Sequence, residues 1–153
     1  MPQLSFHTPI GMLTVSELDG AIVAVDWGWG RDQVETTVLT AARDQVQEYF
    51  DGLRTVFDVP ITLGGSLYAR QVLTAVLWLN YGQTMTYAEL AAHSAGTAAS
   101  VGRVLAGNPL PILVPSHRVL GKTSVGRFAE EAGGAATKRY LLALEARAGA
   151  SPG

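Results

Sequence analysis

The most constraining feature of this sequence is residues 107–120, which read Gly-Asn-Pro-Leu-Pro-Ile-Leu-Val-Pro-Ser-His-Arg-Val-Leu. An apolar run lies between prolines, and Ser116 and His117 follow it directly. With Glu145 further along the chain, they supply the residue types of a Ser-His-acid hydrolase. Adjacent serine and histidine rarely position a serine attack well. These residue types alone therefore leave a catalytic role and a binding role open.

Composition predicts a folded protein with a packed core. The chain has 153 residues, of which 48% are hydrophobic and 16% charged, which suits one domain or two small packed halves. It has no cysteine and only three histidines, so we expect no disulfide, no metal site and no cofactor. The absence of cysteine also fits a cytoplasmic protein. We expect no signal peptide and no membrane association, since the apolar stretches are too short to span a bilayer.

The net charge of −2 hides an asymmetry between the two halves of the chain. Residues 1–65 carry nine acidic side chains against three arginines, and residues 66–153 carry eight basic side chains against four acidic ones. The first half is therefore acidic by six charges and the second half basic by four. This division fits a protein whose second half alone meets an anionic partner, although solvated charges can divide this way by chance.

The first half reads as a hairpin followed by a helix. Residues 13–18 and 21–27 are strand-like, and Asp19-Gly20 between them is a strong hairpin turn signal. Residues 34–52 have apolar side chains at helical spacing and end at a glycine. Residues 59–65 read as a connector.

Three helices are expected in the second half before the proline-bounded segment. Ser66 is the expected N-cap of a helix over 66–80. Thr86 and Glu89 form a capping box that opens a helix over 86–93, and a second short helix over about 97–106 follows a tight turn. Two short helices joined in this way are typical of a helix-turn-helix, whose second helix can enter a DNA groove, but such pairs are often only structural.

Three segments of the chain resemble segments of the O6-alkylguanine-DNA alkyltransferases and follow one another in the same order as in that family. Residues 107–119 resemble the family's active-site pattern of Gly-Asn-Pro, an apolar strand and Pro-Cys-His-Arg-Val. Residues 81–87 resemble its Tyr-Gly-Glu-Thr-x-Ser-Tyr segment, and residues 138–145 its Lys-x-x-Leu-Leu-x-x-Glu helix. The resemblance implies an α/β (α+β) fold. An RNase H-like strand-hairpin-plus-helix domain at 1–64 would pack on a winged helix-turn-helix domain at 65–153.

The resemblance also implies a site from which the acceptor cysteine is missing. Ser116 stands at the acceptor position, His117 and Glu145 match the family's proton relay, and Asn108 matches the asparagine that shapes the turn. A thiol beside an imidazole becomes a thiolate near neutral pH, whereas a serine hydroxyl is far less acidic and attacks an unactivated alkyl carbon slowly. We therefore expect no alkyl transfer to this chain.

In the family, the second helix of the pair enters the minor groove and the damaged guanine flips out of the duplex. Tyr81 is matched to the tyrosine that helps to rotate the target phosphate. Ala99 falls where the family has an arginine that fills the gap left by the flipped base. The expected DNA-contacting residues are Tyr81, Thr97, Ala99, Ser100, Arg103 and Arg118.

The expected pocket lid also departs from the family pattern of Gly-Tyr-Ser-Gly. Its candidate residues here are Val125, Arg127, Phe128 and Ala129. A deliberate cysteine-to-serine replacement in an active alkyltransferase would leave the residue at 99 and the lid intact. Because both differ, we favour a chain that has left the repair reaction, as alkyltransferase-like proteins have, although those keep the arginine at 99.

The expected function is thus DNA repair without alkyl transfer. We expect binding to double-stranded DNA or alkylated guanine by a monomer, with a further repair protein as a possible partner. Two alternatives stay open. One is the engineered replacement of an active enzyme's cysteine. The other is a repurposed pocket that acts on a small molecule through Ser116, His117 and Glu145.

Overall fold

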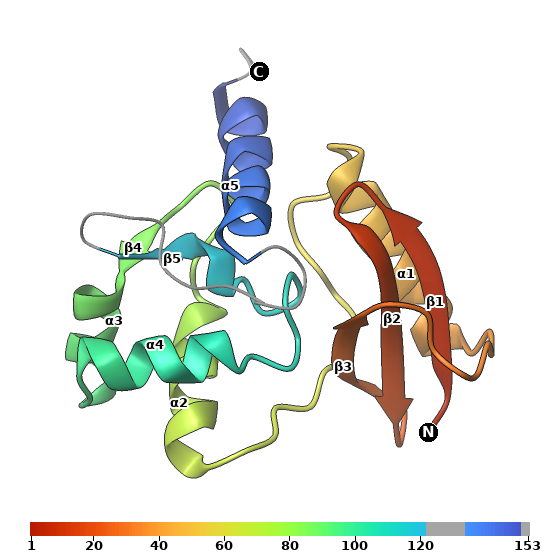
Figure 1. Cartoon of the computed structure of the whole chain (residues 1–153), viewed down its shortest axis with the longest axis horizontal. Coiled ribbons are helices and arrows are strands. Elements are labelled where there is room, and N and C mark those ends of the chain that lie inside the picture. Colours follow the sequence, from red (N-terminus) through yellow and green to blue (C-terminus); the bar gives the residue numbers. More distant parts are fainter. Residues whose placement is uncertain (122–133, 151–153) are drawn as a thin grey trace. The chain divides into compact units, whose positions relative to one another are not determined.

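The computed structural model describes residues 1–121 and 134–150, with side chains to residue 147. The chain divides into two compact units, Met1–Leu63 and Gly64–Gly153. Figure 1 shows their elements in chain order. In the described ranges, no helix is long and apolar enough to cross a membrane.

The first unit is an antiparallel sheet of three strands, β1 (Gln3–Thr8), β2 (Gly11–Leu18) and β3 (Ala21–Trp27). The expected hairpin is confirmed. Asp19 and Gly20, between β2 and β3, both have positive φ, as a tight turn of this kind requires. Strand β1 was not predicted, although Leu4 and Phe6 alternate with polar residues at the spacing of a half-buried strand.

Helix α1 (Thr37–Phe50) packs against all three strands (Figure 1). Paired strand residues such as Leu4 with Val15 and Phe6 with Leu13 are buried, and so are Leu39, Ala42, Val46 and Tyr49 of α1. At about 25 cal/mol for each Å² of apolar surface removed from water, this burial is the main stabilisation of the unit.

Polar side chains on the sheet hold the segment that follows β3. The hydroxyls of Ser5 and Thr14 are 2.7 Å apart. Ser5 Oγ accepts hydrogen bonds from Gly30 N and Gln33 Nε2, and Thr14 Oγ1 donates to Gly28 O. Buried hydroxyls are thus satisfied by a loop, which a hydrophobic pattern does not reveal.

Helix α1 begins later than the expected residue 34. Val34 N donates to the strand carbonyl of Gln3, and Thr36 is the N-cap, with its hydroxyl accepting from Leu39 N and donating to Glu17. These tertiary contacts hold residues 34–36 against the sheet and outside the helix.

The connector also covers the outer edge of β3. Ile22 N donates to Pro60 O at 2.8 Å, and Thr62 N donates to Ile22 O at 3.0 Å. Residues 60–62 thus satisfy backbone groups that an edge strand would otherwise leave exposed.

The second unit is helical. Helices α2 (Leu67–Val76), α3 (Tyr87–Ser94) and α4 (Ala98–Ala106) contact one another. The short strands β4 (Met85–Thr86) and β5 (Val119–Leu120) pair in parallel, and α5 (Ala135–Ala150) ends the described chain (Figure 1). The predicted helix pair is confirmed as α3 and α4.

The predicted caps of the second unit are also confirmed. Ser66 accepts from Ala69 N, and Thr86 and Glu89 form the capping box of α3. Thr97 caps α4 and accepts from Ser100 N. The helix expected over 66–80 ends at Val76, after which the chain tightens into hydrogen bonds between residues three apart.

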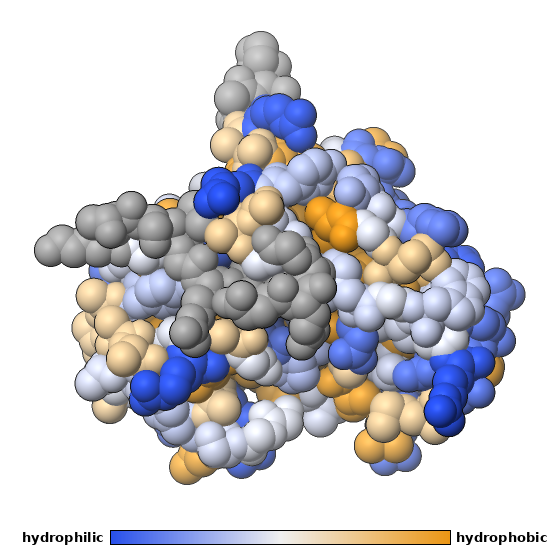
Figure 2. Space-filling view, viewed as in Figure 1, coloured by the Kyte–Doolittle hydropathy of each residue, from blue (hydrophilic) through white to orange (hydrophobic). Residues whose placement is uncertain are grey.

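The surface on the face drawn in Figure 2 mixes polar and apolar residues, and its strongly apolar residues stand in small separate patches. Such a surface is ordinary for a folded protein, because polar atoms cannot cover all of it.

Candidate functional site

The site is built on a tight loop between α4 and α5. Residues 110–114 were expected as an apolar strand, and they form a buried turn in which Val114 N donates to Leu110 O at 2.8 Å. Ile112 has φ of 76°, which is strained for a β-branched residue. Ser116, His117 and Arg118 follow in the single turn η1 (Ser116–Arg118).

Asn108 holds this loop together. Its Oδ1 accepts from Leu110 N at 2.9 Å, and its Nδ2 donates to Val114 O at 3.0 Å. The same Nδ2 also donates to Ser116 Oγ at 3.1 Å. Asn108 therefore bonds both ends of the turn and the side chain at the acceptor position, which is only 2% exposed.

Glu145 of α5 holds the other side of the site. Its Oε2 lies 2.5 Å from His117 Nε2 and accepts from Arg118 Nη2 at 3.1 Å. Its Oε1 accepts from Arg118 Nε at 2.9 Å and from Gly82 N at 3.0 Å. All three side chains of this cluster are buried. A buried carboxylate with four donors around it is a satisfied ionic site.

The surroundings of His117 disfavour its charged form. Burial disfavours the imidazolium and lowers the pKa of His117. The Glu145 carboxylate opposes this shift, and the positive charges of Arg118 and Lys138 add to it. With Nε2 directed at Glu145, Nδ1 is the ring nitrogen on the opposite side.

Ser116 and His117 do not form a catalytic pair in this geometry. Across residues 1–121 and 134–147, the hydrogen bond of the Ser116 hydroxyl is with Asn108 and not with His117. A serine nucleophile needs an imidazole within hydrogen-bonding reach to take its proton. The hydrolase alternative therefore lacks its first requirement.

Lys138 and Tyr87 extend the cluster, and neither was a predicted site residue. Lys138 Nζ donates to Val119 O at 2.5 Å and to the Tyr87 hydroxyl at 3.2 Å, and it lies 5.2 Å from the centre of the Tyr87 ring. Burial lowers the pKa of Lys138 to about 8. In a helix, a lysine seven residues before Glu145 lies on the same face as Glu145. This spacing is the sequence signal from which a place for Lys138 near the site could have been predicted.

The expected DNA-contacting residues fall into two groups. On α4 and its cap, Thr97, Ala99 and Arg103 are exposed, and Ser100 is half-buried against Tyr68, whose hydroxyl lies 2.7 Å from Ser100 Oγ.

Arg118 belongs to the buried cluster, and the half-buried Tyr81 lies against it. Arg118 Nη1 donates to Leu79 O at 2.8 Å, and its guanidinium carbon lies 5.7 Å from the centre of the Tyr81 ring. Burial and the charge of Glu145 raise the pKa of Tyr81. The guanidinium of Arg118 is thus already bound within the protein.

The expected pocket and lid residues lie outside the described residues. They are Val125, Arg127, Phe128 and Ala129. The part of the chain that the structure describes contains no group of three or more His, Cys, Asp or Glu side chains that could hold a metal ion.

Comparison with known families matches both units. Residues 4–63 match the ribonuclease-like domain of 6-O-methylguanine DNA methyltransferase, and residues 68–147 match the DNA-binding domain of the same protein. The chain belongs to the 6-O-methylguanine DNA methyltransferase family. The resemblance seen in the sequence is confirmed, and so is the mixed α/β fold with a ribonuclease-like and a DNA-binding domain.

Curated relatives match most of the chain. The methylated-DNA–protein-cysteine methyltransferase of Mycolicibacterium paratuberculosis is 35% identical over 149 residues, which cover 92% of this chain and 89% of that protein. The constitutive enzyme of Bacillus subtilis is 35% identical over 131 residues, which cover 77% of this chain and 79% of that protein. These relatives are named for transfer to a cysteine, and this chain has none.

Solved structures of this family have the same fold as this chain. The crystal structure of Mycobacterium tuberculosis O6-methylguanine methyltransferase has a TM-score of 0.84 and 30% sequence identity, covering 95% of this chain and 93% of that chain. The structure of the M. tuberculosis OGT protein in complex with DNA has the same TM-score and identity, covering 97% and 94%.

Proposed function

We propose that this protein binds double-stranded DNA and recognises O6-alkylguanine without accepting the alkyl group. One observation carries the proposal. Ser116 occupies the buried acceptor position beside an intact His117–Glu145 pair, in a chain without cysteine. The architecture for holding the acceptor is retained, and the polarisable nucleophile is absent. DNA binding is supported by the relative that was solved in complex with DNA.

In this proposal, the DNA-binding domain comprises residues 65–153 and the N-terminal α/β domain residues 1–64. The exposed side of α4, with Thr97, Ala99 and Arg103, faces the duplex. We leave Arg118 out of the DNA-contacting residues expected from sequence, because its guanidinium is held by Glu145 and Leu79 O. Its proposed role is to position Glu145.

Two experiments test the proposal. The first compares binding to a duplex containing one O6-methylguanine with binding to the matched undamaged duplex at a single salt concentration. We expect measurable binding that weakens steeply with added salt, through counterion release. Binding to neither duplex at low salt would overturn it.

The second experiment tests for alkyl transfer. The protein is incubated with an excess of the methylated duplex and its mass is then measured. We expect no mass increase, because a serine hydroxyl is a poor nucleophile toward an alkyl carbon. A stoichiometric methyl adduct on Ser116 would refute the proposal.

A cytoplasmic location, a monomeric state and a repair-protein partner stay predictions. Size-exclusion chromatography with light scattering tests the monomer. Capture with the lesion duplex as bait, against plain duplex, tests for a partner that requires damaged DNA.

A further inference from the structure

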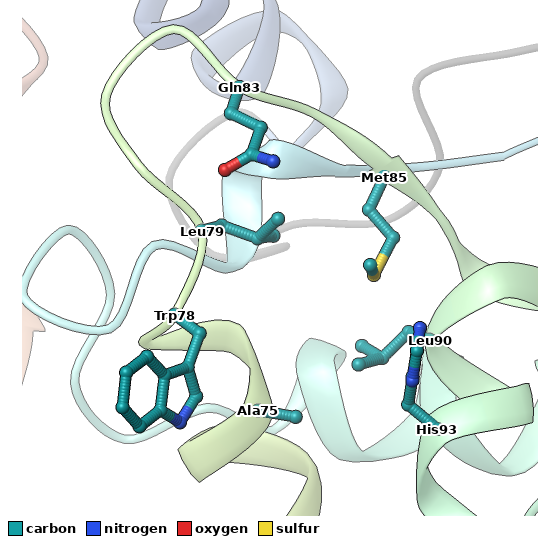
Figure 3. Close-up of a pocket in the computed structure, with 7 residues that line it drawn as sticks. All are labelled: Ala75, Trp78, Leu79, Gln83, Met85, Leu90 and His93. Atoms are coloured by element: carbon teal, nitrogen blue, oxygen red, sulfur yellow. The ribbon is translucent and has the colours of Figure 1, made fainter.

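Helix α2 supports both helices of the helix-turn-helix, but it packs on them unevenly. It contacts α3 and α4. Towards its C-terminal end, a pocket of about 360 Å³ lies between α2, β4 and α3, and Figure 3 shows Ala75, Met85 and Leu90 around it. At the other end of α2, the half-buried Tyr68 reaches across to α4. Because the pocket leaves one end incompletely filled, the contact made by Tyr68 carries more weight in fixing the helix pair on α2.

The Tyr68 hydroxyl forms a hydrogen bond with Ser100 in the first turn of α4. The two oxygens are 2.7 Å apart. Ser100 Oγ also accepts from Thr97 N at 3.0 Å and donates to Thr97 O at 3.0 Å. A serine hydroxyl has one hydrogen to donate and two lone pairs that accept. With its hydrogen directed at Thr97 O, Ser100 accepts from the Tyr68 hydroxyl, and its hydrogen-bonding capacity is filled within the protein.

Gly96, in the turn between α3 and α4, leaves the space that Tyr68 occupies. A methyl group at residue 96 would lie 1.8 Å from the Tyr68 oxygen and 2.7 Å from the ring carbon that bears it. Both distances are well below the roughly 3.5 Å of a van der Waals contact. The backbone of Gly96 does not have positive φ, so the close approach of Tyr68 is the physical reason for a glycine at this position.

These contacts separate Ser100 from its neighbours on α4. Thr97, Ala99 and Arg103 are exposed, whereas Ser100 is half-buried. Ser100 was expected from sequence to contact DNA, but its hydroxyl has no capacity left for a phosphate or a base.

We propose that Tyr68 is a positioning residue for DNA binding, which holds the first turn of α4 on α2 through Ser100. The inference rests on the proposed function, in which the exposed side of α4 faces the duplex. Thr97 and Arg103 can meet the duplex together only while the first turn of α4 keeps its direction. A hydrogen bond to a stiff aromatic side chain sets that direction before DNA binds, so less ordering is left to the binding step.

The test measures the affinity of the full-length protein for plain duplex by fluorescence anisotropy at one salt concentration. Tyr68→Phe removes the hydroxyl and keeps the ring. One hydrogen bond corresponds to about a two- to tenfold change in an equilibrium constant, and we expect binding to weaken by a factor in this range. In the background of Ser100→Ala, where the partner is already missing, Tyr68→Phe should have no further effect.

Thr74→Ala is the matched control on the same helix. It removes the hydrogen bond from Thr74 Oγ1 to Arg70 O, at 2.7 Å on the exposed side of α2. Binding should be unchanged. Circular dichroism and thermal melting confirm that each variant is folded.

Amide hydrogen exchange measures the positioning in the absence of DNA. Ser100 N donates to Thr97 Oγ1 and Val101 N to Thr97 O in the first turn of α4. Tyr68→Phe should speed the exchange of these two amides by about two- to tenfold, because it favours local opening of that turn. Glu89 N, which donates to Thr86 Oγ1 in the first turn of α3, should exchange at the parent rate.

Unchanged binding in Tyr68→Phe would overturn the inference, and so would an equal loss in Thr74→Ala. Additive losses in the double variant would mean that Ser100 acts independently of Tyr68, by contacting DNA, and would also overturn it. If Ser100→Ala does not fold, Tyr68→Phe and the exchange rates decide. A parent protein that binds no duplex refutes the proposed function and with it the role in binding, and the exchange rates then show whether Tyr68 still fixes α4.

Discussion

Glu145 is the residue whose replacement should disturb the site most. Glu145→Gln removes the charge that pairs with Arg118 and replaces one of the two accepting oxygens with a donor, and it leaves a buried guanidinium unneutralised. Breaking a buried pair in this way costs about 3–5 kcal/mol, which we expect as a lower free energy of unfolding in urea. Glu35→Gln, at an exposed pair with Arg43, should change it by less than about 1 kcal/mol. Equal effects would mean that the buried cluster does not stabilise the fold.

Ser116→Cys tests the acceptor position itself. The variant places a thiol under the Asn108 amide, whose Nδ2 donates a hydrogen bond to the side chain at 116. Because a donated hydrogen bond favours the thiolate, we expect a thiol pKa below the ordinary value of about 8.5, measured by the pH dependence of its labelling with iodoacetamide. Methyl transfer from O6-methylguanine should stay slower than in the B. subtilis relative, because the residue at 99 is alanine. Equal rates would show that Ser116 alone separates this chain from an active enzyme.

At the scale of elements, we expect α4 to determine how strongly the protein distinguishes damaged DNA from plain DNA. Ala99 is exposed in the first turn of α4, one turn before Arg103. We predict that Ala99→Arg tightens binding to O6-methylguanine duplex more than binding to plain duplex, because a long side chain there can occupy the space of a flipped base. Fluorescence anisotropy with both duplexes at one salt concentration measures the difference.

Arg103→Ala is the matched control on the same helix. It should weaken binding to both duplexes alike. The slope of the logarithm of the binding constant against the logarithm of the salt concentration should fall by about one. If Ala99→Arg also changes both affinities equally, the arginine acts only as added charge.

At the scale of the whole molecule, two buried bases make stability depend on pH. Burial lowers the pKa of His117 below its ordinary 6.5 and that of Lys138 from 10.5 to about 8. Between each folded pKa and the ordinary value, the unfolded chain binds more protons than the folded chain, so the free energy of unfolding rises with pH. We expect stability to be lost below pH 6.5 and to be gained from pH 8 to 10.5.

Urea unfolding across these windows measures the effect, whose slope for one group is at most about 1.4 kcal/mol per pH unit. Lys138→Met should flatten the upper window and leave the lower one. The account would be contradicted if the free energy of unfolding of the parent protein fell between pH 8 and 10.5 and that of Lys138→Met fell in the same way.

Local elements were predictable where the signal lies in neighbouring residues. The Asp19-Gly20 turn and the caps at Ser66, Thr86 and Thr97 are each determined within four residues of sequence. The predicted helix ends were wrong where the chain forms hydrogen bonds with residues distant in sequence. Val34 bonds to Gln3 and stays outside α1, and Leu79 O accepts from Arg118 where a longer α2 was expected.

The sequence by itself determined the family and the absence of the cysteine nucleophile, because motif order and residue identity are properties of the chain alone. Only the tertiary structure decided what these residues contact. The guanidinium of Arg118 is bound inside the protein by Glu145, and Lys138 joins the cluster through Tyr87 and Val119. Ser116 is bonded to Asn108. The physical reason is that the direction of a buried polar side chain depends on which donors and acceptors the fold brings within about 3 Å, and those partners lie up to 63 residues away.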